Sequence, residues 1–242
     1  MYLDLLSETL VVTGPIFLIV FLGLVLRRIG FIDDHFIHIA SRLVYSVCLP
    51  VLLFSTISQI NLKSTIDLSI LYFSLFGVVF TFGLSWFIAT LIPPREDRGV
   101  VVQGAFRSNL GVIGLALCSN AYGLEGLALA SLLMAGLTIS YNVFSVFVLS
   151  FYAKSDFVWL VLFADILRNP LIIAIALAFI VGSVNLQIPR AFFSAGEYIG
   201  AMALPLALLG TGAGMSLRAL RNSSVATSVV VVLKALILPL AL

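Results

Sequence analysis

The stretch from Gln103 to Asn120 reads QGAFRSNLGVIGLALCSN, and it lies in a chain that is 62% hydrophobic and 10% charged. It is long enough to cross a bilayer, yet it holds Arg107, Ser108 and Asn109 well inside its charged edge. A charge at membrane depth costs roughly a few kcal/mol unless it faces a polar cavity or a partner. The stretch therefore predicts a transport pathway. The alternative is a charge that snorkels to an interface or pairs between helices.

Two glycines, Gly111 and Gly114, follow this polar triplet. Glycine weakens a helix because its backbone loses more entropy on ordering than that of any other residue. A breakable helix with polar residues at membrane depth is typical of transporter substrate sites. We therefore place both glycines, together with Arg107, Ser108 and Asn109, among the predicted substrate-binding residues.

The composition of the whole chain indicates a polytopic membrane protein. Its 242 residues have a mean hydropathy of +1.20, whereas a soluble domain is about 45–50% apolar and about 25% charged. Several apolar segments are long enough to span a bilayer as helices. They lie at residues 11–29, 38–58, 66–92, 99–119, 126–152, 168–186, 192–214 and 224–242. The predicted fold is all-α, with about eight spans and short connections.

The basic residues predict the orientation of these spans. The even-numbered connections hold only Lys63 and Arg190. The basic residues in or flanking the odd-numbered connections are Arg27, Arg28, Arg42, Arg95, Arg98, Lys154, Arg168, Arg218 and Arg221. Because Lys and Arg are enriched in cytoplasmic loops, we expect a multi-pass protein of the plasma (inner) membrane with its amino terminus outside. The segment 157–163 is expected to be either an interfacial helix or the start of a tilted sixth span.

Matching prolines indicate an internal repeat. Pro50 in the second span and Pro205 in the seventh are 155 residues apart, and so are Pro15 and Pro170, which are expected to open the first and sixth spans. Pro50 and Pro205 each remove a helical hydrogen bond, so we expect a break or kink at both. Five spans separate the two halves, which requires repeats of opposite topology, a recurrent transporter architecture.

The offset of the repeat also predicts the domain organisation. A first five-helix repeat covers residues 1–155 and contains the crossover span 99–119, and a second repeat begins in 156–242. The counterpart of Arg107 would fall at position 262, beyond Leu242. A complete protein is therefore expected to hold about 65 further residues with a ninth and a tenth span.

Other polar and small residues in the spans are weaker candidates. Lys234 lies roughly 15 Å into the eighth span, and it either binds substrate or reaches an interface or a backbone carbonyl. Asn142 in the fifth span either lines the pathway or bonds between helices. Gly210 and Gly214 have the spacing of a helix-packing motif, although flexibility would explain them as well.

The remaining candidates argue against an enzyme or a metalloprotein. His35 and His38 lie one helical turn apart beside Asp33 and Asp34, which an ordinary polar loop explains better than a metal site. There is no nucleophile–base pair and no phosphate loop. We expect no cofactor, no metal, no nucleic-acid partner and no enzymatic activity.

Arg107 predicts the charge of the substrate. A guanidinium is always charged and binds a carboxylate with two parallel hydrogen bonds, and the second half of a broken span would add free N–H groups and a positive dipole. The predicted function is a secondary transporter of small organic anions that works by alternating access within the lipid bilayer. A homodimer is compatible with this function. The alternative is a non-transporting membrane receptor or assembly subunit, with an unbroken fourth span and no central cavity.

Several motifs, in order, resemble the auxin efflux carrier family of permeases. They are PIFLIVFLGLVLRRIGF from Pro15, RLVY from Arg42, GAFRSNLGVIG from Gly104, RNP from Arg168 and LPLALL from Leu204. The resemblance covers almost the whole chain. It implies two inverted repeats of five spans, as in sodium/proton antiporter-like folds, whose broken fourth and ninth spans cross at the substrate site. Members carry organic acids such as auxin, malate or malonate.

The chain departs from the family pattern at the crossover. A proline often follows the second crossover glycine in the family, whereas Leu115-Ala116-Leu117 stands here. The break is therefore expected to rest on Gly111 and Gly114 alone. The short fifth connection lacks the long hydrophilic insert of many plant carriers, so a bacterial-type permease is the closer match.

Overall fold

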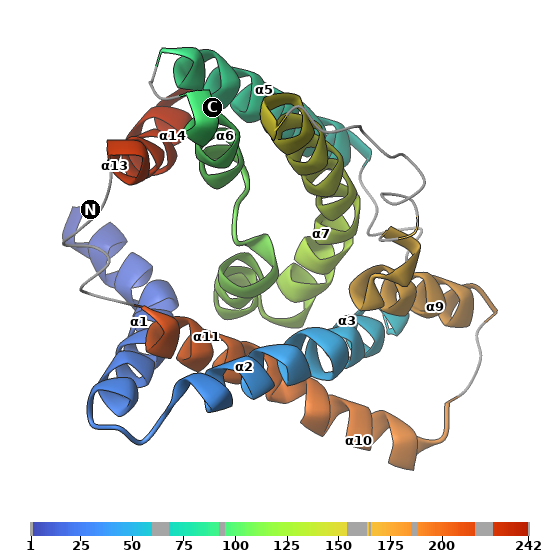
Figure 1. The fold of residues 1–242 in the computed structure, drawn as a ribbon. Helices are drawn as coiled ribbons and strands as arrows, with labels where there is room; N and C mark the ends of the chain where they lie inside the picture. Colours follow the sequence, from blue (N-terminus) through green and yellow to red (C-terminus); the bar gives the residue numbers. More distant parts are fainter. Residues whose placement is uncertain are drawn as a thin grey trace. The chain divides into compact units, whose positions relative to one another are not determined.

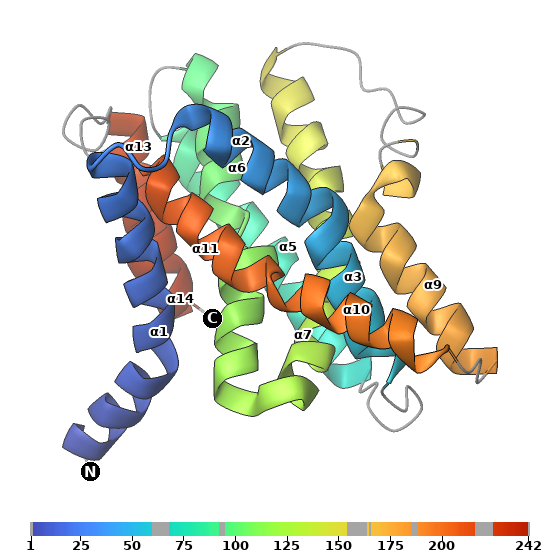
Figure 2. The same cartoon turned by 90° about the horizontal axis from the view of Figure 1, so that it is seen from below.

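The computed structural model describes residues 2–59, 68–91, 95–153, 164, 166–184, 188–215 and 225–241. Every regular element within these residues is a helix (Figures 1 and 2). Five of the described helical segments are long and apolar enough to cross a membrane, and shorter apolar helices accompany them. The structure thus confirms the all-α, polytopic membrane fold. The predicted segment 157–163 lies outside the described residues.

The chain divides into two compact units, and the first comprises residues 1–66, 109–135 and 168–215. It contains α1 (Tyr2–Arg28), α2 (Asp34–Leu43), α3 (Leu49–Ser58), α9 (Pro170–Val184), α10 (Arg190–Ala201) and α11 (Ala203–Gly214). Helix α1 packs along α11, and α3 packs against both α9 and α10 (Figure 2). These helices correspond to the predicted first, second, sixth and seventh spans.

The second unit comprises residues 67–108, 136–167 and 216–242. It contains α5 (Leu68–Thr90), a 3-10 turn (Arg95–Asp97), α6 (Arg98–Phe106), α13 (Val225–Val232), the π-helical turn η4 (Leu233–Ile237) and α14 (Leu238–Ala241). Helix α6 packs against α5 on one side and α13 on another. Phe82 of α5 stacks on Phe144 with ring centroids 4.5 Å apart and meets Phe106 edge-on.

The long helix α7 (Leu115–Ala153) begins in the first unit and ends in the second. Its helical geometry is interrupted at Gly123, where φ is 62° and ψ is −145°, a backbone conformation open almost only to glycine. Gly123 lies between the predicted end of the fourth span, at residue 119, and the predicted start of the fifth span, at residue 126. Gly123 therefore marks the turn that separates those two spans.

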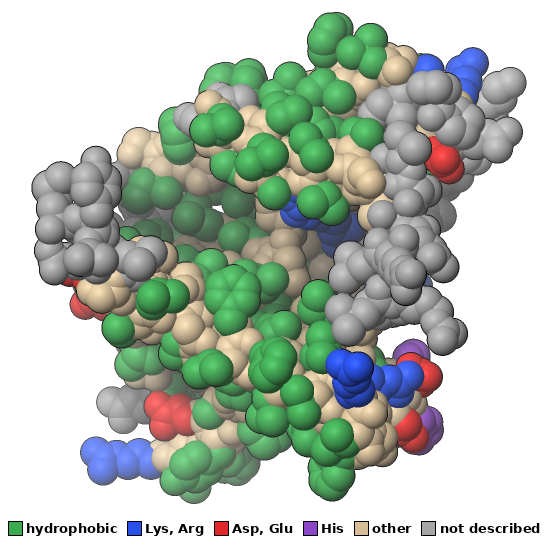
Figure 3. All heavy atoms as spheres, turned by 90° about the vertical axis from the view of Figure 1, so that its left-hand side faces the viewer, with side chains coloured by type: hydrophobic (Ala, Val, Ile, Leu, Met, Phe, Trp, Pro, Cys, Tyr) green, Lys and Arg blue, Asp and Glu red, His purple; other side chains and the backbone are tan. Residues whose placement is uncertain are grey.

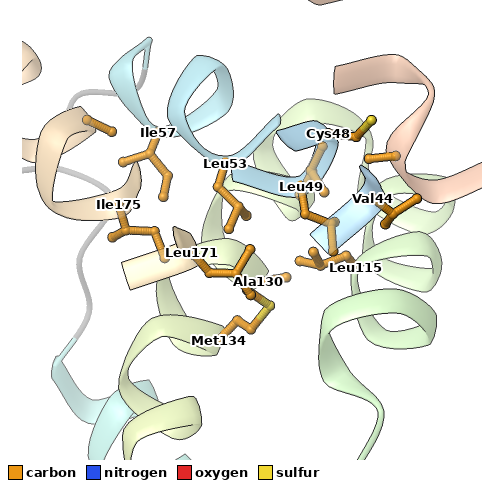
Figure 4. Close-up of a cluster of buried hydrophobic side chains, with 13 residues drawn as sticks. Val44, Cys48, Leu49, Leu53, Ile57, Leu115, Ala130, Met134, Leu171 and Ile175 are labelled. Carbon is orange, nitrogen blue, oxygen red and sulfur yellow. The ribbon is translucent and has the colours of Figure 1, made fainter. Parts of the chain in front are cut away.

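The core of the first unit gathers around α3. Leu49, Leu53 and Ile57 are spaced four residues apart, so they share one face of the helix. Figure 4 shows them beside Leu171 and Ile175 of α9, and all five are buried. Because lipid is as apolar as these side chains, the contacts stabilise the unit mainly through close van der Waals packing.

Much of the outer surface is apolar, as a lipid-facing protein requires. Hydrophobic side chains spread over the face drawn in Figure 3, where most charged side chains lie towards the margins and some Lys or Arg side chains are visible in the middle. On α1, Val11, Phe17, Leu18 and Phe21 are each more than 60% exposed. A helix that is apolar both outside and inside is typical of a membrane span.

The prolines of the predicted repeat coincide with irregular helical geometry, with one exception. A π-helical turn, η1 (Val44–Cys48), precedes Pro50, and the turn residue Met202 separates α10 from α11 just before Pro205. Proline lacks an N–H and clashes with the carbonyl four residues earlier, which explains both irregularities. Pro15, however, lies inside α1 instead of opening it, because the helix already begins at Tyr2.

The polar connection after α1 has a structural role. The Asp33 carboxylate caps α2 by accepting a 2.7 Å hydrogen bond from the Phe36 N–H, and Asp34 pairs with Arg27 at 2.6 Å. The described residues include no group of three or more His, Cys, Asp or Glu side chains that could hold a metal ion. The aspartates beside the two histidines are therefore helix-capping and ion-pairing residues.

Replacing Asp33 with alanine should lower the free energy of unfolding by about 1 kcal/mol, because the first turn of α2 loses its cap. Asp33→Asn should retain most of this stability, since the side-chain amide oxygen of asparagine can also accept the capping hydrogen bond. Asp34→Ala is the matched control and should cost at most about 0.5 kcal/mol, as exposed ion pairs do. Thermal unfolding in detergent measures all three, and an equal loss at both aspartates would contradict the capping role.

Candidate break in the fourth span

The fourth span is broken at three polar residues. Helix α6 ends at Phe106, and Arg107, Ser108 and Asn109 are not helical (Figure 1). Arg107 is extended, with φ −76° and ψ 110°, and Asn109 has φ −84° and ψ 61°, close to an inverse γ-turn. Helical geometry resumes at Leu110. A broken fourth span is what the sequence analysis predicted.

The position of the break differs from the expected one. Gly111 and Gly114 lie inside the π-helical turn η3 (Leu110–Gly114), after the non-helical residues. A β-carbon at Gly114 would come within 2.8 Å of the Leu110 side chain, and one at Gly111 would come within 3.4 Å of the Met134 sulfur. The glycines thus permit a wide, closely packed turn, while Ser108 and Asn109, whose side chains compete for backbone hydrogen bonds, favour the break.

On the second-unit side of the break, Lys234 caps the end of α6. Its ammonium donates to the carbonyl oxygen of Gly104 at 3.2 Å and to that of Arg107 at 2.5 Å. Lys234 was expected either to bind substrate or to reach an interface or a backbone carbonyl. The structure therefore shows the contact with backbone carbonyls directly. The last carbonyls of a helix have no intrahelical partner and carry its negative dipole, so a cation is well placed there.

A cavity of about 480 Å³ adjoins this cap within the second unit. Its polar lining residues are Ser74, Thr81, Ser108, Tyr141 and Lys234. The remainder of its wall is apolar, with aromatic rings from Phe73 and Phe106. Among the described residues that line it, Lys234 is the single charged side chain. A cavity of this size and composition suits a small molecule with a negative group.

The predicted site residues thus divide into groups. Ser108 and Lys234 line the cavity, and Arg107 contributes the carbonyl that Lys234 binds. The Arg107 side chain is exposed and makes no hydrogen bond or ion pair within the described part of the chain. Asn142 is half-buried and is not among the cavity-lining residues, whereas its neighbour Tyr141 is.

On the first-unit side of the break, a new helix begins. Asn109 stands at its N-cap position without a side-chain capping bond, and the first backbone bond runs from the Ile113 N–H to the Asn109 carbonyl at 3.1 Å. The N–H groups of the three residues before Ile113 precede this first bond and are left for other acceptors. Such a helix end attracts anions.

The contribution of α5 to the cavity was not predicted from the sequence. Ser74, Gly77 and Thr81 all line it. They are three of the small or polar residues of this mostly apolar helix, and their positions i, i+3 and i+7 place them on one face. That spacing is a sequence signal for a cavity, but a weaker one than a charge within an apolar segment. Ser and Thr side chains also form hydrogen bonds within their own helix, as Thr81 does to the Gly77 carbonyl at 2.8 Å.

These features define a polytopic membrane protein with a discontinuous span, a class that includes many transporters. The profile of the family described as membrane transport protein matches residues 9–157. This is more than half of the chain, which therefore belongs to that family, the auxin efflux carrier family. No curated protein matches the chain. The protein is accordingly a membrane transporter and not an enzyme.

Proposed function

We propose that the chain is a secondary carrier of small organic anions that works by alternating access. The observation that carries this proposal is the break at Arg107–Asn109, because an exposed guanidinium without a partner among the described residues lies there, inside the predicted fourth span. A charge in that position is costly unless a counter-charge or water compensates it. A carboxylate that binds and leaves would supply this counter-charge transiently.

The chemistry of the break supports the choice of an anion. The Arg107 guanidinium would grip a carboxylate with two parallel hydrogen bonds, and Asn109 would donate from its side-chain amide. No carboxylate lines the cavity of the second unit among the described residues. A cation would therefore lack an oppositely charged partner in that cavity.

The proposal includes an orientation. The amino terminus would face outward and the Arg-rich odd connections would face the cytoplasm of an inner membrane. The basic residues that support it and lie in the described part of the chain, at or next to helix ends, are Arg27, Arg28, Arg42, Arg95, Arg98 and Arg168. Lys154, Arg218 and Arg221 lie outside the described residues.

A flux experiment tests the proposal. The complete gene product is reconstituted in proteoliposomes, and uptake of labelled mono- and dicarboxylates is compared with uptake of labelled organic amines. We expect saturable carboxylate uptake that unlabelled carboxylates compete, with no amine uptake. Carboxylate binding without flux would instead favour the alternative, a membrane receptor. Flux of amines alone would overturn the assignment of an anion.

A further inference from the structure

We propose that Lys234 is the positioning residue of the broken span: by holding the end of α6, its ammonium fixes the backbone from which Arg107 projects. This inference rests on the proposed function for its link to anion transport, and it rests on the geometry of the second unit for its mechanism.

A helix that stops at membrane depth leaves an electrostatic problem. Its last carbonyl groups lack N–H partners, and water is not generally available in the hydrocarbon core to supply them. In α6 the Gln103 carbonyl still accepts from the Arg107 N–H at 3.2 Å. The Gly104 and Arg107 carbonyls receive their hydrogen bonds from Lys234. One ammonium thus satisfies acceptors on both sides of the last helical residue, Phe106.

The packing of α6 against α13 is built to let this lysine reach. A β-carbon at Gly104 would come within 3.3 Å of a methyl group of Val230, so the absence of a side chain there lets the two helices approach closely. Val230 lies one helical turn before Lys234. Lys234 itself lies in the π-helical turn η4, a local geometry that is frequent at functional sites, next to the fully buried Leu233.

The same ammonium also faces the cavity. It has three N–H groups, and the two carbonyl bonds use two of them. Because Lys234 lines the cavity beside Ser108, the third N–H is available to a carboxylate there. Holding α6 and meeting the substrate are therefore compatible tasks for this residue, and the first does not require substrate.

The first test measures the backbone position without substrate. In a protein with Cys48 and Cys118 replaced by alanine, Ser108→Cys reports on the break, and Ser74→Cys reports on the part of the same cavity that α5 lines. We expect Lys234→Met to change the rate of maleimide labelling at position 108 by about fivefold or more and to leave position 74 unchanged, whereas Lys234→Arg, which keeps the donors, restores the rate at 108.

A second variant tests the same contact without removing the charge. Gly104→Ala should push α6 from α13 and change labelling at position 108 in the same direction as Lys234→Met. Adding Val230→Ala to Gly104→Ala should restore the rate, because the smaller side chain makes room for the added methyl group. This pair keeps the proposal testable if Lys234→Met fails to fold.

Transport supplies the link to function. Lys234→Met should raise the KM for the carboxylate by about tenfold, which matches the loss of one charge-assisted hydrogen bond. Unchanged labelling at position 108, or equal changes at 108 and 74, would overturn the proposal, since the second result signals a general loosening of the unit. If the wild-type protein moves no organic anion, the proposed function fails, while the labelling result still decides whether Lys234 holds the break.

Discussion

Replacing Arg107 with alanine is expected to reduce carboxylate transport by the complete protein by about 10- to 100-fold in Vmax/KM. The physical reason is the loss of a charge-assisted, bidentate partner for the carboxylate, which is worth about 1.5–3 kcal/mol. Each 1.4 kcal/mol or so corresponds to a factor of ten. Uptake of a labelled carboxylate into proteoliposomes at several concentrations measures the effect.

Two variants control this experiment. Arg107→Lys keeps the positive charge and loses the planar fork, so it should retain an intermediate activity, about tenfold below the wild type. Arg95→Ala removes an exposed arginine from the short 3-10 turn before α6, away from the break, and should leave transport unchanged. Unchanged transport in Arg107→Ala at equal protein levels would exclude this residue from the substrate site.

Stability separates a binding role from a structural one at Arg107. Its side chain is exposed and makes no hydrogen bond or ion pair in the described structure. Removing it should therefore leave the thermal midpoint of unfolding nearly unchanged while transport falls. A parallel loss of stability and transport would favour the alternative weighed from the sequence, a charge that pairs structurally between helices.

The spans could be predicted from the sequence because their signal is local. Length and hydropathy decide whether a segment crosses a membrane, so every predicted span has helical residues in the structure. The ends were less well placed. The first span was predicted to begin at residue 11, whereas α1 begins at Tyr2, since a helix can extend beyond the apolar part of its sequence.

The repeat could be inferred in outline but stays a prediction. The first unit takes up spans one, two, six and seven, and the second unit takes up spans three and eight. Spans that are equivalent under the 155-residue offset therefore fall in the same compact unit, which is what an inverted repeat would produce. No local pattern could have predicted this interleaving, because it arises from contacts between segments far apart in the chain.

The candidate site was predictable only in part. A charge within an apolar segment is a strong sequence signal, and it led directly to the residues that prove to be non-helical, Arg107 to Asn109. The glycines were a misleading signal for the exact place, because a glycine can widen a helical turn as well as break it. The contact of Lys234 with two carbonyls depends on the packing of α13 against α6, and such a contact leaves no mark in the sequence around either partner.

The glycine of α11 that lies closest to α1 is not one of the two glycines in the predicted helix-packing motif. Gly210 and Gly214 have the expected spacing, but a β-carbon at either would meet no heavy atom within 4 Å. Gly212, between them, lies against α1, where an added β-carbon would overlap the carbonyl oxygen of Val20. Gly23 of α1 makes the reciprocal approach to the carbonyl oxygen of Leu209. The helix face, and not the four-residue spacing, decides which glycine matters.

Gly212→Ala is therefore expected to lower the stability of the first unit, although alanine favours a helix. The overlap with the α1 backbone cannot be relieved by rotating a side chain, so α1 and α11 must separate, at a cost of about 1–3 kcal/mol. This corresponds to a fall of several degrees in the thermal midpoint, at about 2–4 °C per kcal/mol for a chain of this size. Gly210→Ala, two residues away, should leave the midpoint unchanged or raise it, since it gains helix propensity without a clash.

The pair Gly23 and Gly212 allows a sharper test of the same contact. Gly23→Ala and Gly212→Ala each force α1 and α11 apart, so the separation that one causes should make room for much of the methyl group that the other adds. The double variant should therefore lose less stability than the sum of the two single variants. Gly23 and Gly210 should instead be additive, because Gly210 has no neighbour that a methyl group would displace. Equal effects of Gly212→Ala and Gly210→Ala would mean that the backbone approach of α1 to α11 does not limit packing there.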